Sequence, residues 1–443
     1  MLLTIEETNR LSGHKMLLKK IESKEAKVTI VGLGYIGLPT ALFYKRSGLD
    51  ITGIDTNEEL VAELRKGRIR MREGGLEQLA EKYLSEIVLE TSYDAITGSD
   101  VFVLCLPSPV DEDDKPVTRY LENSVSDIAS RVKRDSLVIV ESTVPVGTTE
   151  QLSSLFAKTS GKTPDNEFWF AHCPERVLPG QVVQEMDTIH RLAGGVSDLS
   201  TSLAIAFLKT IFKPELIHPT NARVSETAKL AENAFRDVGV AYANELARLC
   251  TSLSIDVREV IKLANLHPRV DILNPGLGVG GYCLPKDGWI LVESVSKLDG
   301  NAVLIPAARQ VNDSMPAHVS KRIRDVVLDL SVRSTVGILG LSFKPNVSDT
   351  RNSPSLELIN LLWSTGIEVI VYDPLVEQEL GDRKAETIDE ILESCEVLVL
   401  GAAHEVLLEE LRNNDLSEMV LVDPSGAASE LKHYVRKYVG LSI

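Results

Sequence analysis

Short apolar runs alternate with helical patterns along the first half of the chain. The runs KVTIVGLG, LDITGID, DVFVLCLP and DSLVIVEST are rich in valine and isoleucine, which is typical of buried strands. The segments between them, such as GLPTALFYKRSG and NEELVAELRKG, carry apolar residues at helical spacing. Strands that alternate with helices predict a doubly wound parallel sheet.

The pattern changes at Ala222, where apolar residues recur at intervals of three and four as far as Cys250. This spacing predicts one long helix, followed by a helical region to about Arg324. The last third returns to strand-like runs in the order of the first, namely STVGILGLSF, IEVIVYDP, CEVLVLGAA and MVLVDPSG. We therefore expect an α/β protein with two Rossmann-like, doubly wound parallel-sheet domains joined by a long central helix. The expected bounds are 1–26 for an N-terminal extension, 27–221, 222–325 and 326–443.

Composition restricts the function class. The net charge of −17 argues against a general nucleic-acid binder, which needs a basic surface. There is no apolar run of about 18 residues that predicts a membrane span, and the charged N-terminus does not resemble a secretory signal. The five cysteines are widely spaced without a CxxC pair, so we expect free thiols in the cytoplasm and no metal site. Cys105 and Cys395 lie in apolar runs and are interpreted as structural.

A dinucleotide fingerprint follows the first predicted strand. Gly32, Gly34 and Gly37 have the spacing GxGxxG between a strand and a helix, and Asp55 ends the next strand. Glycines at these positions permit a tight turn, close approach of a pyrophosphate and close packing of helix on strand. An acid at the position of Asp55 suits the ribose hydroxyls of NAD and would repel a 2′-phosphate. FAD is the competing cofactor, although nothing else in the sequence indicates a flavin site.

One cysteine stands in a different setting. The segment NPGLGVGGYCLPKD places Cys283 among glycines and prolines, directly before Lys286 and Asp287. A nearby ammonium group favours a thiolate, and a thiolate can trap an aldehyde for a second oxidation. A cysteine that merely packs in a glycine-rich turn is the alternative.

Two further groups of polar residues stand out. Lys229, Asn233 and Arg236 occupy one face of the long helix, which we expect to be largely buried, and could stabilise a developing alkoxide. A solvated polar stripe is the alternative. In FKPNVSDTRNSP, Lys344 and Arg351 flank a loop before a helix, which suits either a phosphate ligand or an ordinary solvated loop.

From about Lys27 to its end, the sequence resembles the UDP-glucose/GDP-mannose dehydrogenase family. The motifs that carry the resemblance are VGLGYIGLP, ESTVPVGTT, CPERVLPG, AKLAENAFRDV, HPRVDILNPGLGVGGYC and FKPNVSDTRNSPS. The resemblance implies a four-electron oxidation with two NAD and one water on a UDP-bound sugar. It also implies that 27–221 binds NAD, that 222–325 forms a homodimer or part of a higher homo-oligomer, and that 326–443 binds the UDP-sugar.

The resemblance also implies roles for individual residues. Cys283 is expected to form a thioester. The other expected catalytic residues are Lys229, Asn233, Asp287, Glu175 and Thr143. The expected cofactor contacts are Gly32, Gly34, Tyr35, Ile36, Gly37, Asp55, Thr143 and Arg351. The expected substrate contacts are Glu175, Arg176, Lys229, Arg236, Gly280, Lys344 and, across a dimer, Arg269.

The sugar is less sharply indicated than the reaction. The CPERVLPG, AENAFRDVGV and HPRVD segments are most similar to the UDP-N-acetyl-D-mannosamine group of the family, and Arg236 is expected to read the 2-substituent. The string GYCLPKD, with Tyr282 and Lys286, is similar to UDP-glucose dehydrogenases instead. We therefore expect a UDP-N-acetyl-D-mannosamine 6-dehydrogenase, with UDP-glucose or another UDP-N-acetylhexosamine as the alternative substrate. A silent nucleotide-sugar-binding protein is the third hypothesis.

Overall fold

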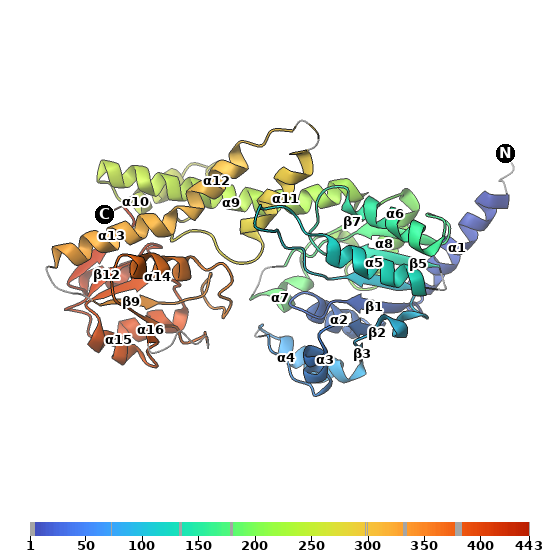
Figure 1. The fold of residues 1–443 in the computed structure, drawn as a ribbon, viewed down its shortest axis with the longest axis horizontal. Coiled ribbons are helices and arrows are strands. Elements are labelled where there is room, and N and C mark those ends of the chain that lie inside the picture. The colour runs from blue at the N-terminus through green and yellow to red at the C-terminus, as the bar shows by residue number, and fades with distance from the viewer. Residues whose placement is uncertain are drawn as a thin grey trace. The chain divides into compact units, whose positions relative to one another are not determined.

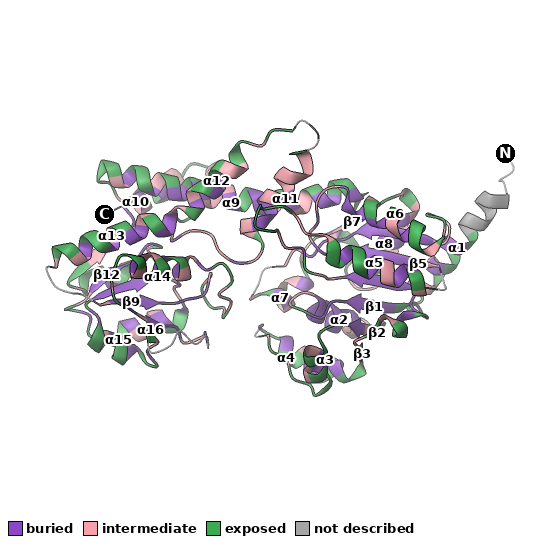
Figure 2. Cartoon of the chain, viewed as in Figure 1, coloured by how far each residue is buried: buried purple, intermediate pink, exposed green. Residues whose placement is uncertain are grey.

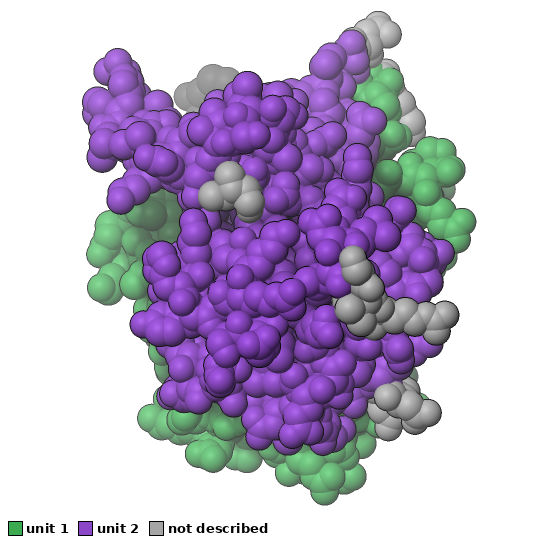
Figure 3. Space-filling model, turned by 90° about the vertical axis from the view of Figure 1, so that its left-hand side faces the viewer, with its two compact units in different colours: residues 1–231, 293–299 green, residues 232–292, 300–443 purple. Residues whose placement is uncertain are grey.

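The structure is a computed structural model, and it describes residues 5–71, 73–132, 135–177, 180–296, 298, 300–330, 335–376 and 383–442. The chain divides into two compact units, coloured in Figure 3. Residues 1–231 and 293–299 form the first unit, and residues 232–292 and 300–443 form the second.

The first unit contains an eight-stranded sheet in the order β3-β2-β1-β4-β5-β6-β7-β8. Its neighbouring strands pair in parallel except β6 and β7, which are antiparallel. The strands are β1 (Lys27–Val31), β2 (Asp50–Ile54), β3 (Val88–Glu90), β4 (Val101–Leu104), β5 (Ser136–Val140), β6 (Phe168–His172), β7 (Arg191–Gly195) and β8 (Ile217–Asn221).

Helices cover both faces of this sheet (Figure 1). Apolar side chains of α1, α2 and α8 share one core cluster with the sheet, and those of α5 and α6 share another. The helices are α1 (Ile5–Glu22), α2 (Gly37–Arg46), α3 (Glu58–Arg65), α4 (Leu76–Tyr83), α5 (Arg119–Arg131), α6 (Thr148–Ser160), α7 (Val182–Met186) and α8 (Asp198–Lys209), with short 3-10 turns η1 (Leu84–Glu86), η2 (Tyr93–Ile96) and η3 (Pro214–Leu216).

The segment before Lys27 is attached to the first unit by α1. Leu17 and Ile21 are buried, and the buried His14 lies with its Nε2 2.8 Å from Ser202 Oγ on α8. Lys20 donates to Asp100 Oδ1 at 2.6 Å. These contacts give the extension a packed helical end.

The second unit contains a five-stranded parallel sheet in the order β10-β9-β11-β12-β13. The strands are β9 (Val336–Leu339), β10 (Val369–Tyr372), β11 (Val397–Leu400), β12 (Val420–Val422) and β13 (Lys437–Val439). The remaining elements are α10 (Val257–Ala264), α11 (Leu284–Ser296), α12 (Leu304–Asp313), α13 (Met315–Asp329), α14 (Pro354–Ser364), α15 (Ile388–Ser394), α16 (Glu405–Asn413) and η5 (Ser429–His433). The expected fold class, with two Rossmann-like sheets, is confirmed.

The long helix α9 (Ala222–Leu253) contributes to both units. The central strands β4, β5, β6, β9 and β11 are wholly buried, whereas α9 alternates buried and exposed positions (Figure 2). Phe235, Tyr242 and Leu249 are exposed at seven-residue intervals, with 79% of Phe235 accessible. The expectation that this helix is largely buried was therefore wrong for the single chain, because the described residues leave this apolar face exposed.

Candidate active site

The glycine loop between β1 and α2 has the geometry of a nucleotide cradle. A Cβ atom on Gly32, which has φ +91°, would lie 2.6 Å from Cys105 O, and one on Gly37 would lie 1.7 Å from Gly32 O. Both positions therefore require glycine for reasons internal to the fold. A Cβ on Gly34 would meet nothing within 4 Å, so this glycine faces open space that a pyrophosphate can enter.

Asp55 lies beside this loop at the end of β2. Its Oδ2 accepts a hydrogen bond from Leu33 N at 2.8 Å, and its Oδ1 accepts one from Asn57 N at 2.9 Å. The carboxylate is partly exposed, so lone pairs remain for ribose hydroxyls. The glycine loop and the Asp55 carboxylate together have the geometry that NAD binding requires.

Tyr35 and Ile36, the other expected cofactor contacts in the loop, are half-buried. Ile36 precedes α2, and the Tyr35 hydroxyl donates to the buried Glu73 carboxylate. The same carboxylate accepts from Gly180 N at 2.7 Å. Glu73 thus ties the nucleotide loop to the segment that follows the CPER motif.

The segment that carries Thr143 is held by a buried carboxylate from α9. Glu226 accepts hydrogen bonds from Gly147 N at 2.6 Å and from Thr149 N and Oγ1 at 2.8 and 2.6 Å. An anion at the N-terminus of α6 satisfies donors that the helix leaves unpaired. Thr143 itself is half-buried just before this turn.

His172, which the sequence analysis did not single out, connects three segments with expected catalytic residues. It is fully buried at the end of β6, and burial lowers its pKa to about 3. Its Nε2 lies 3.3 Å from Ser142 O, next to Thr143, and its Nδ1 lies 2.9 Å from Ser225 Oγ, one turn before Lys229. Since a carbonyl oxygen only accepts, Nε2 carries the proton.

Glu175 is held tightly as an ion. Its Oε1 accepts from Arg176 N at 2.6 Å and from Val177 N at 2.8 Å, and its Oε2 accepts from Arg191 Nη1 at 2.6 Å. Burial opposes the charge, yet Arg191 outweighs it and keeps the pKa of Glu175 below its ordinary value. The side chain of Arg176 donates to His190 O at 2.9 Å.

In the second unit, Cys283 lies at the start of α11 and is exposed. Its carbonyl oxygen accepts from Lys286 N at 3.2 Å and from Asp287 N at 3.0 Å, so Cys283 caps the helix N-terminus. A helix N-terminus stabilises a thiolate through its partial positive charge. This contribution comes in addition to the lysine that the sequence pointed to.

Asp287 organises the residues around this helix start. It is inaccessible to solvent, and its two oxygens accept from Asn233 Nδ2 at 2.6 Å and from Lys286 Nζ at 2.7 Å. Burial alone would lower the pKa of Lys286, but the charges of Asp287 and Cys283 raise it above its ordinary value. Three expected catalytic residues, Cys283, Asn233 and Asp287, are thus brought together.

The two glycines before Cys283 have a packing reason of their own. A Cβ on Gly280 would lie 2.4 Å from Asn352 O, and one on Gly281 would lie 2.8 Å from the Phe343 ring. Gly281 N also donates to Arg351 O at 2.9 Å. These glycines let the chain pack closely against itself, and this packing joins the cysteine loop to the loop of Lys344 and Arg351.

A buried hydrogen-bond network that includes Asp373 and His404 holds the loop of Lys344. Asp373 Oδ2 accepts from Leu341 N at 2.6 Å and lies 3.1 Å from His404 Nε2, while Asn346 N donates to His404 Nδ1 at 2.8 Å. Asp373 stands in this domain where Asp55 stands in the first. Gly340, with φ +86°, directly follows β9, and Gly337 lies within that strand.

The other expected substrate contacts lie on the surface. Arg236 on α9 and Arg269 after α10 are exposed, and Lys344 is half-exposed. Arg351 is exposed and pairs with Asp349 at 2.6 Å. The roles assigned to all these residues stay predictions.

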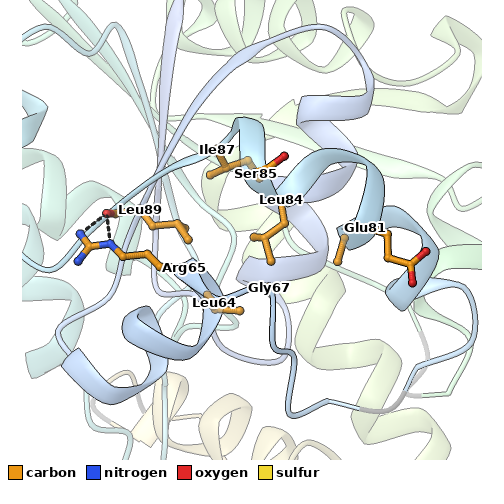
Figure 4. A pocket seen from close by; sticks show the side chains of 9 residues that line it. Leu64, Arg65, Gly67, Glu81, Leu84, Ser85, Ile87 and Leu89 are labelled. Atoms are coloured by element: carbon orange, nitrogen blue, oxygen red, sulfur yellow. Dashed lines mark hydrogen bonds between the residues drawn. The ribbon is translucent and has the colours of Figure 1, made fainter.

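A separate pocket of about 400 Å³ lies beside α3, α4 and β3 (Figure 4). Its lining is mainly aliphatic, and the Arg65 guanidinium at its edge donates to Leu89 O. None of the residues that line it belongs to the expected site.

Within the described residues, no helix is long and apolar enough to cross a membrane.

Models of one protein family match most of the chain. Residues 26–215 match the UDP-glucose/GDP-mannose dehydrogenase family, NAD binding domain. Residues 223–314 match the central domain of that family, and residues 337–430 match its UDP binding domain.

Individual relatives agree with these matches. A UDP-N-acetyl-D-mannosamine dehydrogenase of Methanococcus maripaludis is 35% identical over 398 residues, covering 89% of each chain. The structure of UDP-D-ManNAc dehydrogenase from Pyrococcus horikoshii has a TM-score of 0.86 and 33% identity, covering 94% of this chain and 99% of that one. A UDP-glucose dehydrogenase from Pyrobaculum islandicum has a TM-score of 0.84 and 27% identity, covering 94% and 98%.

Proposed function

Because the chain belongs to the UDP-glucose/GDP-mannose dehydrogenase family and is an NAD-dependent UDP-sugar dehydrogenase, we propose that it oxidises UDP-N-acetyl-D-mannosamine at C6 to the uronate. The observation that carries the proposed chemistry is the exposed thiol of Cys283 at the N-terminus of α11. The sugar is supported by relatives of that name at 35–37% identity over most of the chain.

The proposed reaction consumes one water and two NAD⁺ and yields the carboxylate, two NADH and three protons. NAD⁺ bound at the glycine loop supplies a hydride acceptor for each of the two oxidations. The Cys283 thiolate adds to the C6 aldehyde, and after the second oxidation its sulfur is acylated as a thioester. Water then attacks the acyl carbon, and the sulfur leaves as a thiolate.

Other residues stabilise charge and position water in this scheme. Lys229 and Asn233, one turn apart on α9, hold the oxyanions that form at C6. Asp287, fixed by Asn233 and Lys286, orients the hydrolytic water, and Glu175 and Thr143 position water and protons. Lys344 contacts the diphosphate, Gly280 shapes the cysteine loop, and Arg269 reaches the site of a partner subunit in a dimer.

Incubation of the pure protein with NAD⁺ and a panel of UDP-sugars tests the proposal. We expect two NADH per molecule of UDP-N-acetyl-D-mannosamine, and a Cys283→Ala variant that produces no uronate. Absence of NADH with every sugar would refute the proposal and favour a silent binding protein.

UDP-glucose is the second candidate substrate, since Tyr282 and Lys286 stand in the GYCLPKD string and a UDP-glucose dehydrogenase shares the fold. Arg236→Leu separates the two sugars. If Arg236 reads the 2-substituent, the variant loses its preference for the N-acetylated sugar, whereas an unchanged ratio of kcat/KM values contradicts that role.

A further inference from the structure

A buried cluster of ionisable groups lies next to the glycine loop between β1 and α2. Its members follow the ends of neighbouring strands. Cys105 follows β4, Glu141 follows β5 and Glu175 comes shortly after β6. The carboxyl ends of adjacent parallel strands meet at one edge of a sheet, which brings these side chains together. Cys105 also lies next to the glycine loop, because a Cβ built on Gly37 would lie 3.1 Å from the Cβ of Cys105.

The register of the antiparallel pair explains the arginine in this cluster. His172 on β6 lies opposite Gly194 on β7, so continuing the register by three residues places Glu175 opposite Arg191. The two side chains form an ion pair at 2.6 Å, and both are more than nine-tenths buried. The guanidinium also stacks over Phe212 at 4.4 Å.

Glu141 is the group in this cluster without a counter-ion of its own. It is 4% exposed, its Oε2 accepts from Cys105 Sγ at 3.0 Å, and its backbone oxygen accepts from Glu175 N at 3.4 Å. Two buried carboxyl groups thus face a single guanidinium. Ionising two adjacent carboxyl groups in a site without water carries a high electrostatic free energy, so the pair retains one proton.

The other groups that face Glu141 do not supply a second charge. Burial raises the pKa of Cys105 and of Tyr44 on α2 well above their ordinary values, and it raises the pKa of Cys173 to about 12. Burial and the charge of Glu175 raise the pKa of Glu141 to about 8. The proton therefore resides on Glu141, while Glu175 stays ionised against Arg191.

We propose that Glu141, as a neutral carboxylic acid, is a positioning residue that holds Glu175 as an oriented carboxylate at the Arg191 ion pair. This inference rests on the proposed function, which gives Glu175 its part in the water step. Glu141 donates its proton toward Glu175 and accepts from Cys105, so the Glu175 carboxylate stays where backbone donors and Arg191 place it.

Loss of that proton disturbs the ion pair. Ionised Glu141 repels Glu175 and competes for Arg191, whose Nε and Nη2 are buried without a hydrogen-bond partner in the described residues. Glu175 then shifts from its orientation, and the water step slows as the pH rises through about 8.

The test compares pH profiles of wild type and Glu141→Gln with NAD⁺ and UDP-N-acetyl-D-mannosamine. Glutamine keeps a neutral donor at this position and cannot ionise. We expect wild-type kcat to fall above pH 8, by about tenfold for each further unit, and this fall to be absent in Glu141→Gln. Glu150→Gln changes a half-exposed glutamate on α6 and serves as the control, for which we expect the wild-type profile. A Glu141→Gln profile with the same alkaline fall would overturn the inference.

Thermal unfolding without substrate separates this inference from the proposed function. The folded-state pKa of Glu141 lies above its unfolded value, so wild type loses stability relative to Glu141→Gln as the pH rises from about 4.5 to 8. A difference in Tm that does not vary with pH would overturn the buried proton. The Tm difference between wild type and Glu141→Gln can also depend on pH in a protein that oxidises none of the UDP-sugars. That result would overturn the proposed function and the positioning role of Glu141, but it would leave the buried proton on Glu141 supported.

Discussion

The ion pair between Lys286 and Asp287 lets the energetics around Cys283 be tested quantitatively. Replacing Asp287 by asparagine keeps the size of the side chain but removes the counter-ion of a lysine that is 6% exposed. At the 2.7 Å separation of Nζ and Oδ1, the Coulomb attraction is about 6 kcal/mol for an effective dielectric constant of about 20. Desolvation offsets part of it, and removing one partner of a buried pair costs about 3–5 kcal/mol.

We therefore expect Asp287→Asn to lower Tm by roughly 10 °C, since a unit of this size loses about 2–4 °C per kcal/mol. Differential scanning calorimetry of the apoprotein measures this shift. Asp329→Asn is the control, because Asp329 and its partner Lys437 are largely exposed and their pair contributes about 1 kcal/mol at most.

A double variant sharpens the test. Lys286→Met combined with Asp287→Asn removes both charges, so its Tm should lie well above the value expected if the two single effects were added. Strict additivity, or a shift of less than about 2 °C in Asp287→Asn, would show that the pair is not a desolvated ion pair and refute the reasoning. If Asp287 orients the hydrolytic water as proposed, the single and the double variant should both lack activity, because both lack its carboxylate.

Three further predictions follow from single contacts. The Gly34→Ala variant should fold with an unchanged Tm but raise KM for NAD⁺ at least tenfold, because its methyl group points into the open space that the pyrophosphate of NAD⁺ would fill. Gly98→Ala, at a similarly open position, is the control for both measurements. Glu226→Gln should lower Tm by several degrees, because three hydrogen bonds to a charged acceptor are each worth about 1.5–3 kcal/mol, and an unchanged calorimetric trace would contradict this. If α9 forms the interface of a homodimer, Tyr242→Glu should convert a dimer to monomers in analytical ultracentrifugation, and a variant that stays dimeric would place the interface elsewhere.

The sequence predicted the sheets and the glycine loop well because their signals are local. A strand, three glycines and an acid at fixed spacing leave little freedom, and the structure adds only that Gly34 is the glycine that faces open space. The position of Cys283 at the N-terminus of α11 is less evident from the sequence, where Pro285 is the local signal for a helix start. Burial of α9 was mispredicted because an apolar periodicity does not distinguish a core face from an uncovered one.

Long-range pairs were the hardest to predict. Nothing near Glu175 in the sequence points to Arg191, since their contact depends on a strand reversal and a register that spans the intervening loop. The apolar run around Cys105 indicates only a structural thiol, and nothing adjacent in the sequence indicates its hydrogen bond to Glu141. The rule that strand ends gather at one edge could have found that pair, because Cys105 and Glu141 lie near the carboxyl ends of two successive predicted strands.

The carboxylate of Asp373 has a consequence for protein engineering. In both sheets the residue after the loop glycine donates its N–H to an aspartate, Leu33 to Asp55 and Leu341 to Asp373. Asp55 faces solvent in part, whereas Asp373 is closed off by the inaccessible ring of His404. Grafting glycines into the second loop would therefore not by itself create a dinucleotide site there. Such a redesign would first have to replace His404 by a smaller residue. That change would remove the hydrogen bond from Asn346 N and so destabilise the loop that carries Lys344.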